Sequence, residues 1–153
     1  LNALAGQLTV HEATKIEGTG NAPWGVVIGS VWSAVFVDGV TAITNNAFEH
    51  CTAMESVSIP KSVTSIGRGV LFSCENLSSI AIPSSVETIA GIHSLIAEVG
   101  IVDVSKNQNF VFVGDALLSK DMANFICCPP TMYDDYEIPN SVNLIAESAF
   151  IDC

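Results

Sequence analysis

The chain has 153 residues, of which 49% are hydrophobic and 14% are charged, and its 16 acidic residues against 5 basic ones give a formal net charge of −11. This length suits one domain with a real core, and the high apolar content excludes an intrinsically disordered chain. Nucleic acid and anionic lipid are excluded as partners, because both require clustered Lys and Arg and the five basic residues are scattered.

Residues 1–34 are predicted to form an N-terminal strand and loop segment that precedes the repeats. The longest stretch without charge, Gly18–Val37, contains Asn, Pro, Gly and Ser, and its apolar residues are mostly β-branched. A spanning helix needs about 20 predominantly apolar residues, so this stretch is predicted to be a loop, and no membrane span is expected. The chain begins without a signal-peptide pattern and stops part-way through a repeat, which indicates a piece of a longer protein.

Residues 35–153 repeat a pattern with a period of 23 residues. The sequence Ser58–Ile66 recurs at Ala81–Ile89, and a third copy lies at Glu137–Ile145. A second element, Ala-Phe-x-x-Cys or its variant, occupies Ala47–Cys51, Val70–Cys74 and Ala149–Cys153. Each copy also carries an apolar-x-apolar triplet, at Val35–Val37, Val57–Ile59, Ile80–Ile82, Val102–Val104 and Tyr136–Ile138.

This period lies in the range of leucine-rich repeats and is too short for two full helices per copy. The triplet predicts a short strand that buries alternate side chains, and a short helical turn is expected on the return path near Asn45–His50. The predicted fold class is therefore an α/β repeat solenoid, with coils of about 23 residues and a parallel sheet of one short strand per coil. Twelve residues are predicted to form its core: Val40, Ile43, Phe48, Val57, Ile59, Val63, Ile66, Leu71, Ile80, Ile82, Val86 and Ile89.

The combined motif, Ile-Pro-x-Ser-Val-x-x-Ile followed by Ala-Phe-x-x-Cys, resembles the BspA-like leucine-rich repeats of bacterial and protist surface proteins. The third coil departs from this motif, because His93, Ser94 and Ala97 replace Ala, Phe and Cys. The resemblance implies a β-hairpin inserted between coils at about 110–130, and a last coil truncated at 153. It also implies an extracellular or cell-surface location, since members of the family are known mainly as secreted or surface adhesion modules.

The cysteines are predicted to be packing residues. Cys51, Cys74 and Cys153 hold the same position in three coils, so they form a column of free thiols whose parallel side chains suit a bridge poorly. Cys127 and Cys128 are adjacent in the second strand of the hairpin and face opposite ways. No C-x-x-C spacing for zinc or redox chemistry occurs.

No catalytic constellation, metal site or cofactor motif is found, and the chain is predicted not to be an enzyme. His11, His50 and His93 have no spacing that suggests metal ligation, and no H-E-x-x-H or G-x-S-x-G occurs. The acidic run at Asp134, Asp135 and Glu137 is interpreted as solvated charge, because Ca²⁺ requires six to eight oxygens from a shaped loop.

The middle residue of each triplet is predicted to face solvent, and together these residues form a tentative binding strip on the concave sheet: Phe36, Ser58, Ala81, Asp103 and Glu137. Two functions stay open. The first is a protein-recognition or adhesion module that binds a protein ligand, such as a host or extracellular-matrix protein, as the resemblance implies. The second is a structural spacer or assembly module, with end-to-end self-association of coils.

Overall fold

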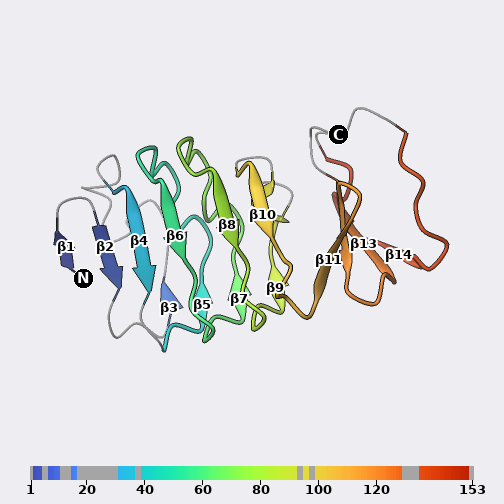
Figure 1. Cartoon of the computed structure of the whole chain (residues 1–153), viewed down its shortest axis with the longest axis horizontal. Coiled ribbons are helices and arrows are strands. Elements are labelled where there is room, and N and C mark those ends of the chain that lie inside the picture. Colours follow the sequence, from blue (N-terminus) through green and yellow to red (C-terminus); the bar gives the residue numbers. More distant parts are fainter. Residues whose placement is uncertain are drawn as a thin grey trace.

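The computed structural model describes residues 2–4, 7–10, 15–16, 31–36, 39–92, 95–96, 99–128 and 135–151. One row of strands forms the front of the molecule in Figure 1: β1 (Asn2–Leu4), β2 (Gln7–Val10), β4 (Ser33–Phe36), β6 (Ser56–Ser58), β8 (Ser79–Ala81) and β10 (Ile101–Asp103). A second row lies behind and below it: β3 (Lys15–Ile16), β5 (Ala42–Ile43), β7 (Ser65–Ile66) and β9 (Thr88–Ile89).

The front row stacks one strand per coil in parallel, as the repeat predicts. β2, β4 and β6 pair in parallel, with Ala34 opposite Val57, and β8 pairs with β10, with Ile80 opposite Val102. β6 and β8 lie in contact between these two pairs. β1 pairs antiparallel with β2 at the N-terminal end. The predicted solenoid of parallel coils of about 23 residues is therefore confirmed.

The second row is a separate parallel sheet that the sequence interpretation did not anticipate. It forms where the Val-x-x-Ile element passes from one coil to the next, and each of its strands has only two residues. The Gly67 amide donates to the Ile43 carbonyl at 2.7 Å, and the Ala90 amide donates to the Ile66 carbonyl at 2.8 Å. The interior coils thus contribute two strands each, one per sheet.

The return path consists of hydrogen-bonded turns, with almost no helix among the described residues. The segment near Asn45–His50, predicted as a helical turn, is held by bonds such as Cys51 amide to Phe48 carbonyl at 3.1 Å. Asn46 and His50 have φ angles of 58° and 63°, so the chain twice enters the left-handed region there. These tight reversals bring the polypeptide back to the strand within one coil.

Gly67 stands where two neighbouring coils approach most closely. A Cβ atom at this position would lie 2.6 Å from the Thr44 carbonyl carbon and 2.6 Å from the Asn45 Oδ1 atom. Real Cβ atoms do not approach backbone atoms so closely, and the Thr44 backbone is fixed by its own coil. Glycine is therefore required at Gly67 by the contact between coils.

The core runs along the inside of the coils between the two sheets. Most of the predicted core residues are buried, and Val57, Ile59 and Ile89 are partly buried against the same cluster. The solvent-shielded centre also includes residues of the Ala-Phe-x-x-Cys element, such as Ala47, Cys51 and Cys74. The periodic apolar positions of the sequence therefore form one continuous core.

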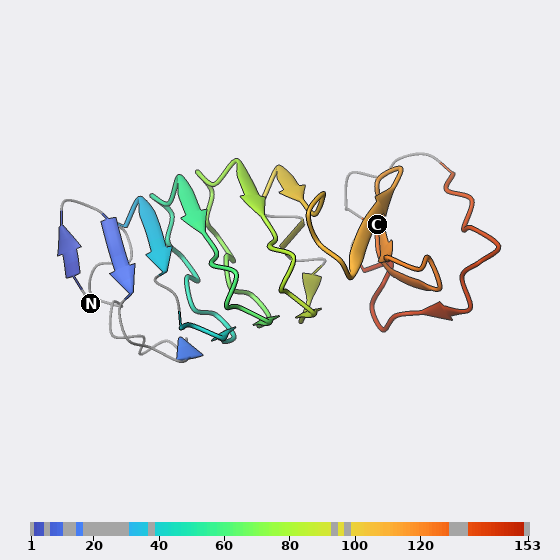
Figure 2. The ribbon, with the colours of Figure 1, turned by 60° about the horizontal axis from the view of Figure 1, so that its bottom comes forward.

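The insertion after the fourth coil is larger than the predicted hairpin. β11 (Phe110–Val113), β12 (Ala116–Ser119) and β13 (Asn124–Cys127) form an antiparallel unit of three strands, and β14 (Leu144–Ile145) joins β13 in parallel. The first two strands are joined through Gly114, whose φ of 58° suits the first position of a tight hairpin turn. Figure 2 shows this unit beside the end of the stacked coils.

Several expectations fall outside the described residues: the residues His93, Ser94, Ala97 and Cys153, the triplet member Val37, and most of the stretch Gly18–Val37. The boundary between residues 1–34 and 35–153 stays a prediction. In the described part of the chain, no helix has the length and apolar character needed to cross a bilayer.

Candidate binding groove

Three of the five residues predicted to form the strip lie side by side on the front sheet. Ser58, Ala81 and Asp103 are the last residues of β6, β8 and β10, and all three are exposed. Ala81 and Asp103 are direct partners in the parallel register. Their neighbours Ile80 and Val102 are buried, so the predicted inward and outward alternation holds here.

Phe36 does not belong to the strip, and its prediction as an exposed residue is wrong. Its side chain is only 5% exposed, and its ring meets the Phe48 ring edge-on with centroids 5.6 Å apart. Val35, not Phe36, pairs with Ser58. The reason is the phase of the repeat, since 58 − 23 is 35, whereas the triplet at Val35–Val37 was read one residue late.

Glu137 is exposed but lies elsewhere, so it also leaves the strip. Residues 135–139 form no strand, although a strand was predicted at Tyr136–Ile138. The Tyr136 hydroxyl donates to the Val113 carbonyl at 3.0 Å, which places this segment beside the inserted strands. The insertion thus separates Glu137 from Asp103, an effect that the repeat motif alone does not indicate.

The surface around the three remaining residues is hollowed into a groove of about 330 Å³, which we call the strand-end groove. Its floor comes from the ends of β6, β8 and β10 and from the residues that follow them. The lining residues are Val57, Ser58, Ile59, Lys61, Ala81, Ile82, Pro83, Ser84, Asp103 and Lys106. This volume lies at the lower end of the range of about 300–1,000 Å³ typical of ligand sites.

Two lysines of the groove, Lys61 and Lys106, were not singled out from the sequence. A signal was present, because Lys61, Ser84 and Lys106 are spaced by 23 and 22 residues and hold equivalent positions in three consecutive coils. The small Ser84 between them leaves the space that the groove occupies. Aligning the repeats on the residue after Pro60 and Pro83 would have identified this column.

Asp103 is held as a carboxylate at one end of the groove. The side-chain and backbone hydrogen bonds from Ser105, followed by the positive charge of Lys106, lower the pKa of Asp103 below its ordinary value. The Ser105 amide donates to Asp103 Oδ1 at 2.8 Å. Asp103 therefore contributes a fixed negative charge next to a lysine.

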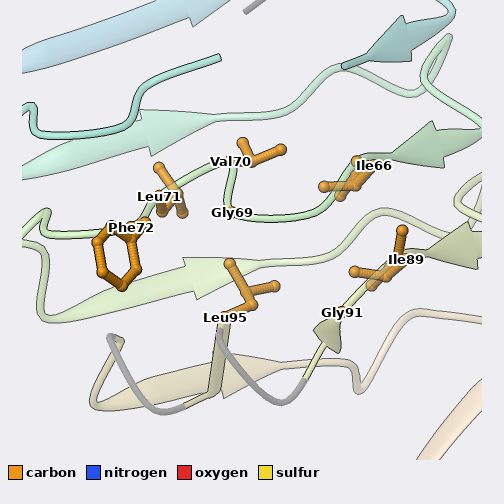
Figure 3. A pocket seen from close by; sticks show the side chains of 10 residues that line it. Ile66, Gly69, Val70, Leu71, Phe72, Ile89, Gly91 and Leu95 are labelled. Atoms are coloured by element: carbon orange, nitrogen blue, oxygen red, sulfur yellow. The ribbon is translucent and has the colours of Figure 1, made fainter. Parts of the chain in front are cut away.

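A second, much smaller void lies inside the coils and is shown in Figure 3. It measures about 10 Å³ and is lined by apolar residues such as Ile66, Leu71, Ile89 and Leu95. A space of this size barely admits one water molecule, which would find no polar side chain there. This void is a packing defect between two coils and is too small for a ligand.

The groove offers binding contacts, and the described side chains form no recognisable reaction centre around it. Within the ranges that the structure covers, no three His, Cys, Asp or Glu side chains gather in a way that could hold a metal ion. His50 lies on the return path, where its ring meets Phe72 edge-on at 5.8 Å and Glu49 is 3.8 Å from its Nε2 atom. It is remote in the coil from the strand ends.

The cysteines follow the prediction only in part. Cys51, Cys74 and Cys127 are free and buried, and burial raises the pKa of Cys51 to about 11 and that of Cys127 to about 12. Cys127 packs in the main core and Cys128 in the second cluster, so the two side chains do face opposite ways. Cys128, however, is disulfide-bonded, which corrects the expectation of five free thiols.

Comparisons with known proteins support the repeat assignment. The sequence pattern of the family described as "BspA type Leucine rich repeat region (6 copies)" matches residues 29–96. No curated protein sequence matches the chain.

Solved structures share the fold at low sequence identity. A leucine-rich repeat protein from Eubacterium ventriosum is 20% identical, with a TM-score of 0.51, and the match covers 94% of this chain and 52% of that one. The pneumococcal vaccine antigen PcpA is 20% identical, with a TM-score of 0.51 and coverage of 78% and 36%. A leucine-rich cell surface protein from Faecalibacterium prausnitzii is 21% identical, with a TM-score of 0.54 and coverage of 79% and 39%. The chain thus spans about half the length of these proteins or less.

Proposed function

Since the chain carries BspA-type leucine-rich repeats, we propose that it is a non-enzymatic protein-recognition module of a secreted or cell-surface protein, and that the strand-end groove contacts its ligand. The observation that carries the proposal is the groove itself, in which Ser58, Ala81 and Asp103 present small or polar groups from three rigid parallel strands. Extended surfaces of this kind are what repeat proteins use to bind partners.

Two further observations support a location outside the cytosol. Two of the structural neighbours are described as a vaccine antigen and a cell surface protein. Cys128 is disulfide-bonded, and disulfides persist in oxidising compartments. An adhesion role toward a host or extracellular-matrix protein fits both observations.

Filling the groove is expected to abolish ligand binding without unfolding the protein. In Ala81→Tyr, the new ring would occupy the floor of the groove, whereas the change in the free energy of unfolding should stay within about 0.5 kcal/mol because Ala81 is exposed. The wild type and the variant would be compared by surface plasmon resonance on immobilised fibronectin, laminin and collagen.

Thr88→Tyr is the matched control, because Thr88 is an exposed residue of β9 in the second sheet. The proposal predicts saturable binding to at least one matrix protein, lost in Ala81→Tyr and kept in Thr88→Tyr. Equal loss in both variants, or no binding by the wild type, would contradict it.

A specific observation favours an assembly role as the second candidate. Ile145 and Phe150 of the last coil are 49% and 48% exposed, whereas Ile43 and Phe48, which hold equivalent positions in an interior coil, are 2% and 0% exposed. Leu144 and Ile151 are exposed on the same coil. Such an apolar surface is typical of a contact with another coil.

Self-association through this surface is expected to be weakened by charge. Ile145→Glu would place a carboxylate among the exposed apolar residues and should reduce a concentration-dependent dimer, measured by sedimentation velocity, at least tenfold in affinity. Ile101→Glu is the control, because Ile101 is 65% exposed on β10. A wild type that stays monomeric at submillimolar concentration would rule out self-association as the role of this surface.

A further inference from the structure

We propose that the strand-end groove binds an acidic peptide segment of its protein partner, with a carboxylate of the peptide held between Lys61 and Lys106. This inference rests on the proposed function and specifies the chemistry of its ligand. It follows from the positions of the two lysines, from their lack of acidic partners, and from the apolar walls around them.

The two lysines flank the groove symmetrically. Lys61 follows β6, Lys106 follows β10, and the equivalent residue after β8 is Ser84. Neighbouring strands lie about 4.8 Å apart, so the two backbones are separated by about 10 Å across two spacings. Each lysine side chain is about 6 Å long, and both ammonium groups can therefore reach one anion above Ser84.

Neither lysine is neutralised within the protein. Among the residues that the structure describes, the ion pair found is between Glu49 and His50, and neither Lys61 nor Lys106 has a carboxylate at ion-pair distance. This is unusual for a chain with 16 acidic and 5 basic residues, where most cations have acids available nearby. Two of the five basic residues thus remain for a ligand in one groove.

The one acid of the groove does not cancel this charge. Asp103 accepts a hydrogen bond from the Ser105 amide at 2.8 Å, which orients its carboxylate toward its own turn. The three charged side chains of the groove leave a local charge of +1, in a molecule of formal charge −11. An anionic group is therefore favoured in the groove and disfavoured over the rest of the surface.

The walls of the groove favour a peptide over a bare anion. Val57, Ile59, Ile82 and Pro83 supply apolar contacts beside the lysines. A volume of about 330 Å³ accommodates the side chains of a few residues. An extended segment with one carboxylate and an adjoining apolar side chain would use both kinds of contact.

The test is an NMR titration of the whole chain with a defined probe. The probe is a hexapeptide of alternating Glu and Leu, acetylated and amidated at its ends, and the control peptide replaces Glu by Gln. The proposal predicts that the Glu peptide, but not the Gln peptide, shifts the amide signals of Ser58, Ala81, Ser84 and Lys106. The affinity should fall as salt rises from about 0.05 to 0.5 M, because the lysines are exposed.

Charge-reversal variants identify the residues responsible. Lys61→Glu and Lys106→Glu are each expected to weaken binding of the Glu peptide roughly tenfold or more, because each replaces an attraction with a repulsion. Lys120→Glu is the matched control, since Lys120 is exposed in the turn after β12 and changes the net charge equally. Its affinity for the peptide should stay within about twofold of the wild type.

Three outcomes would overturn the proposal: equal shifts with both peptides, equal weakening by Lys120→Glu, or binding of heparin with no binding of the peptide. The proposed function is judged separately by Ala81→Tyr on matrix proteins. If Ala81→Tyr abolishes matrix binding while the Glu peptide does not bind, the groove is a recognition surface for a different chemistry and the acidic-peptide inference alone fails.

Discussion

Replacing Phe48 with Ala is expected to lower the free energy of unfolding by about 4 kcal/mol. Phe48 is 0% exposed, its ring meets Phe36 edge-on at 5.6 Å, and its amide donates to the Val70 carbonyl of the next coil at 2.9 Å. Removing the ring leaves a cavity that fixed coils on either side cannot close. Urea unfolding followed by circular dichroism would measure the loss.

Two variants calibrate this result. Phe72→Ala removes the same ring from a side chain that is 43% exposed and should cost no more than about 1 kcal/mol. Phe48→Leu introduces the residue found at the equivalent position Leu71 and should cost less than half as much as Phe48→Ala. A loss below about 1.5 kcal/mol in Phe48→Ala would mean that this part of the core is loosely packed.

Asn107→Ala is expected to cost about 3 kcal/mol, although the side chain is polar. Asn107 is 2% exposed and makes four hydrogen bonds. Its Nδ2 atom donates to the carbonyls of Pro83 at 2.6 Å and Val86 at 3.0 Å, and its Oδ1 atom accepts from the amides of Asn109 at 2.7 Å and Phe110 at 3.0 Å. Alanine would leave buried backbone groups without partners.

The design of this experiment separates hydrogen bonding from size. Asn107→Asp keeps the shape and the acceptor but loses both donors, so it should destabilise the protein at least as much as Asn107→Ala at neutral pH. Asn76→Ala removes one exposed bond, from Asn76 Nδ2 to the Thr52 carbonyl at 2.8 Å, and should cost less than about 1 kcal/mol. If the costs of Asn107→Ala and Asn76→Ala are equal, the network at Asn107 is not needed for stability.

The sequence was sufficient to predict the fold because the repeat reports the core directly. A residue that faces inward in one coil faces inward in the next, so the recurrence of Ile43 at Ile66 and of Ile80 near Val102 predicts both burial and strand pairing. The same logic located Ser58, Ala81 and Asp103 on one face. It erred at Phe36, where the motif is degenerate and a shift of one residue reverses the face.

Tertiary structure alone decided what happens where the repeat is interrupted. The third strand of the insertion, the displacement of Glu137 from the strip and the bonded state of Cys128 depend on contacts between segments without a common period. The groove likewise exists because a small residue, Ser84, lies between Lys61 and Lys106 once three coils are stacked. Periodicity fixes which residues share a face, whereas depth, charge and neighbours on that face arise only when the coils pack together.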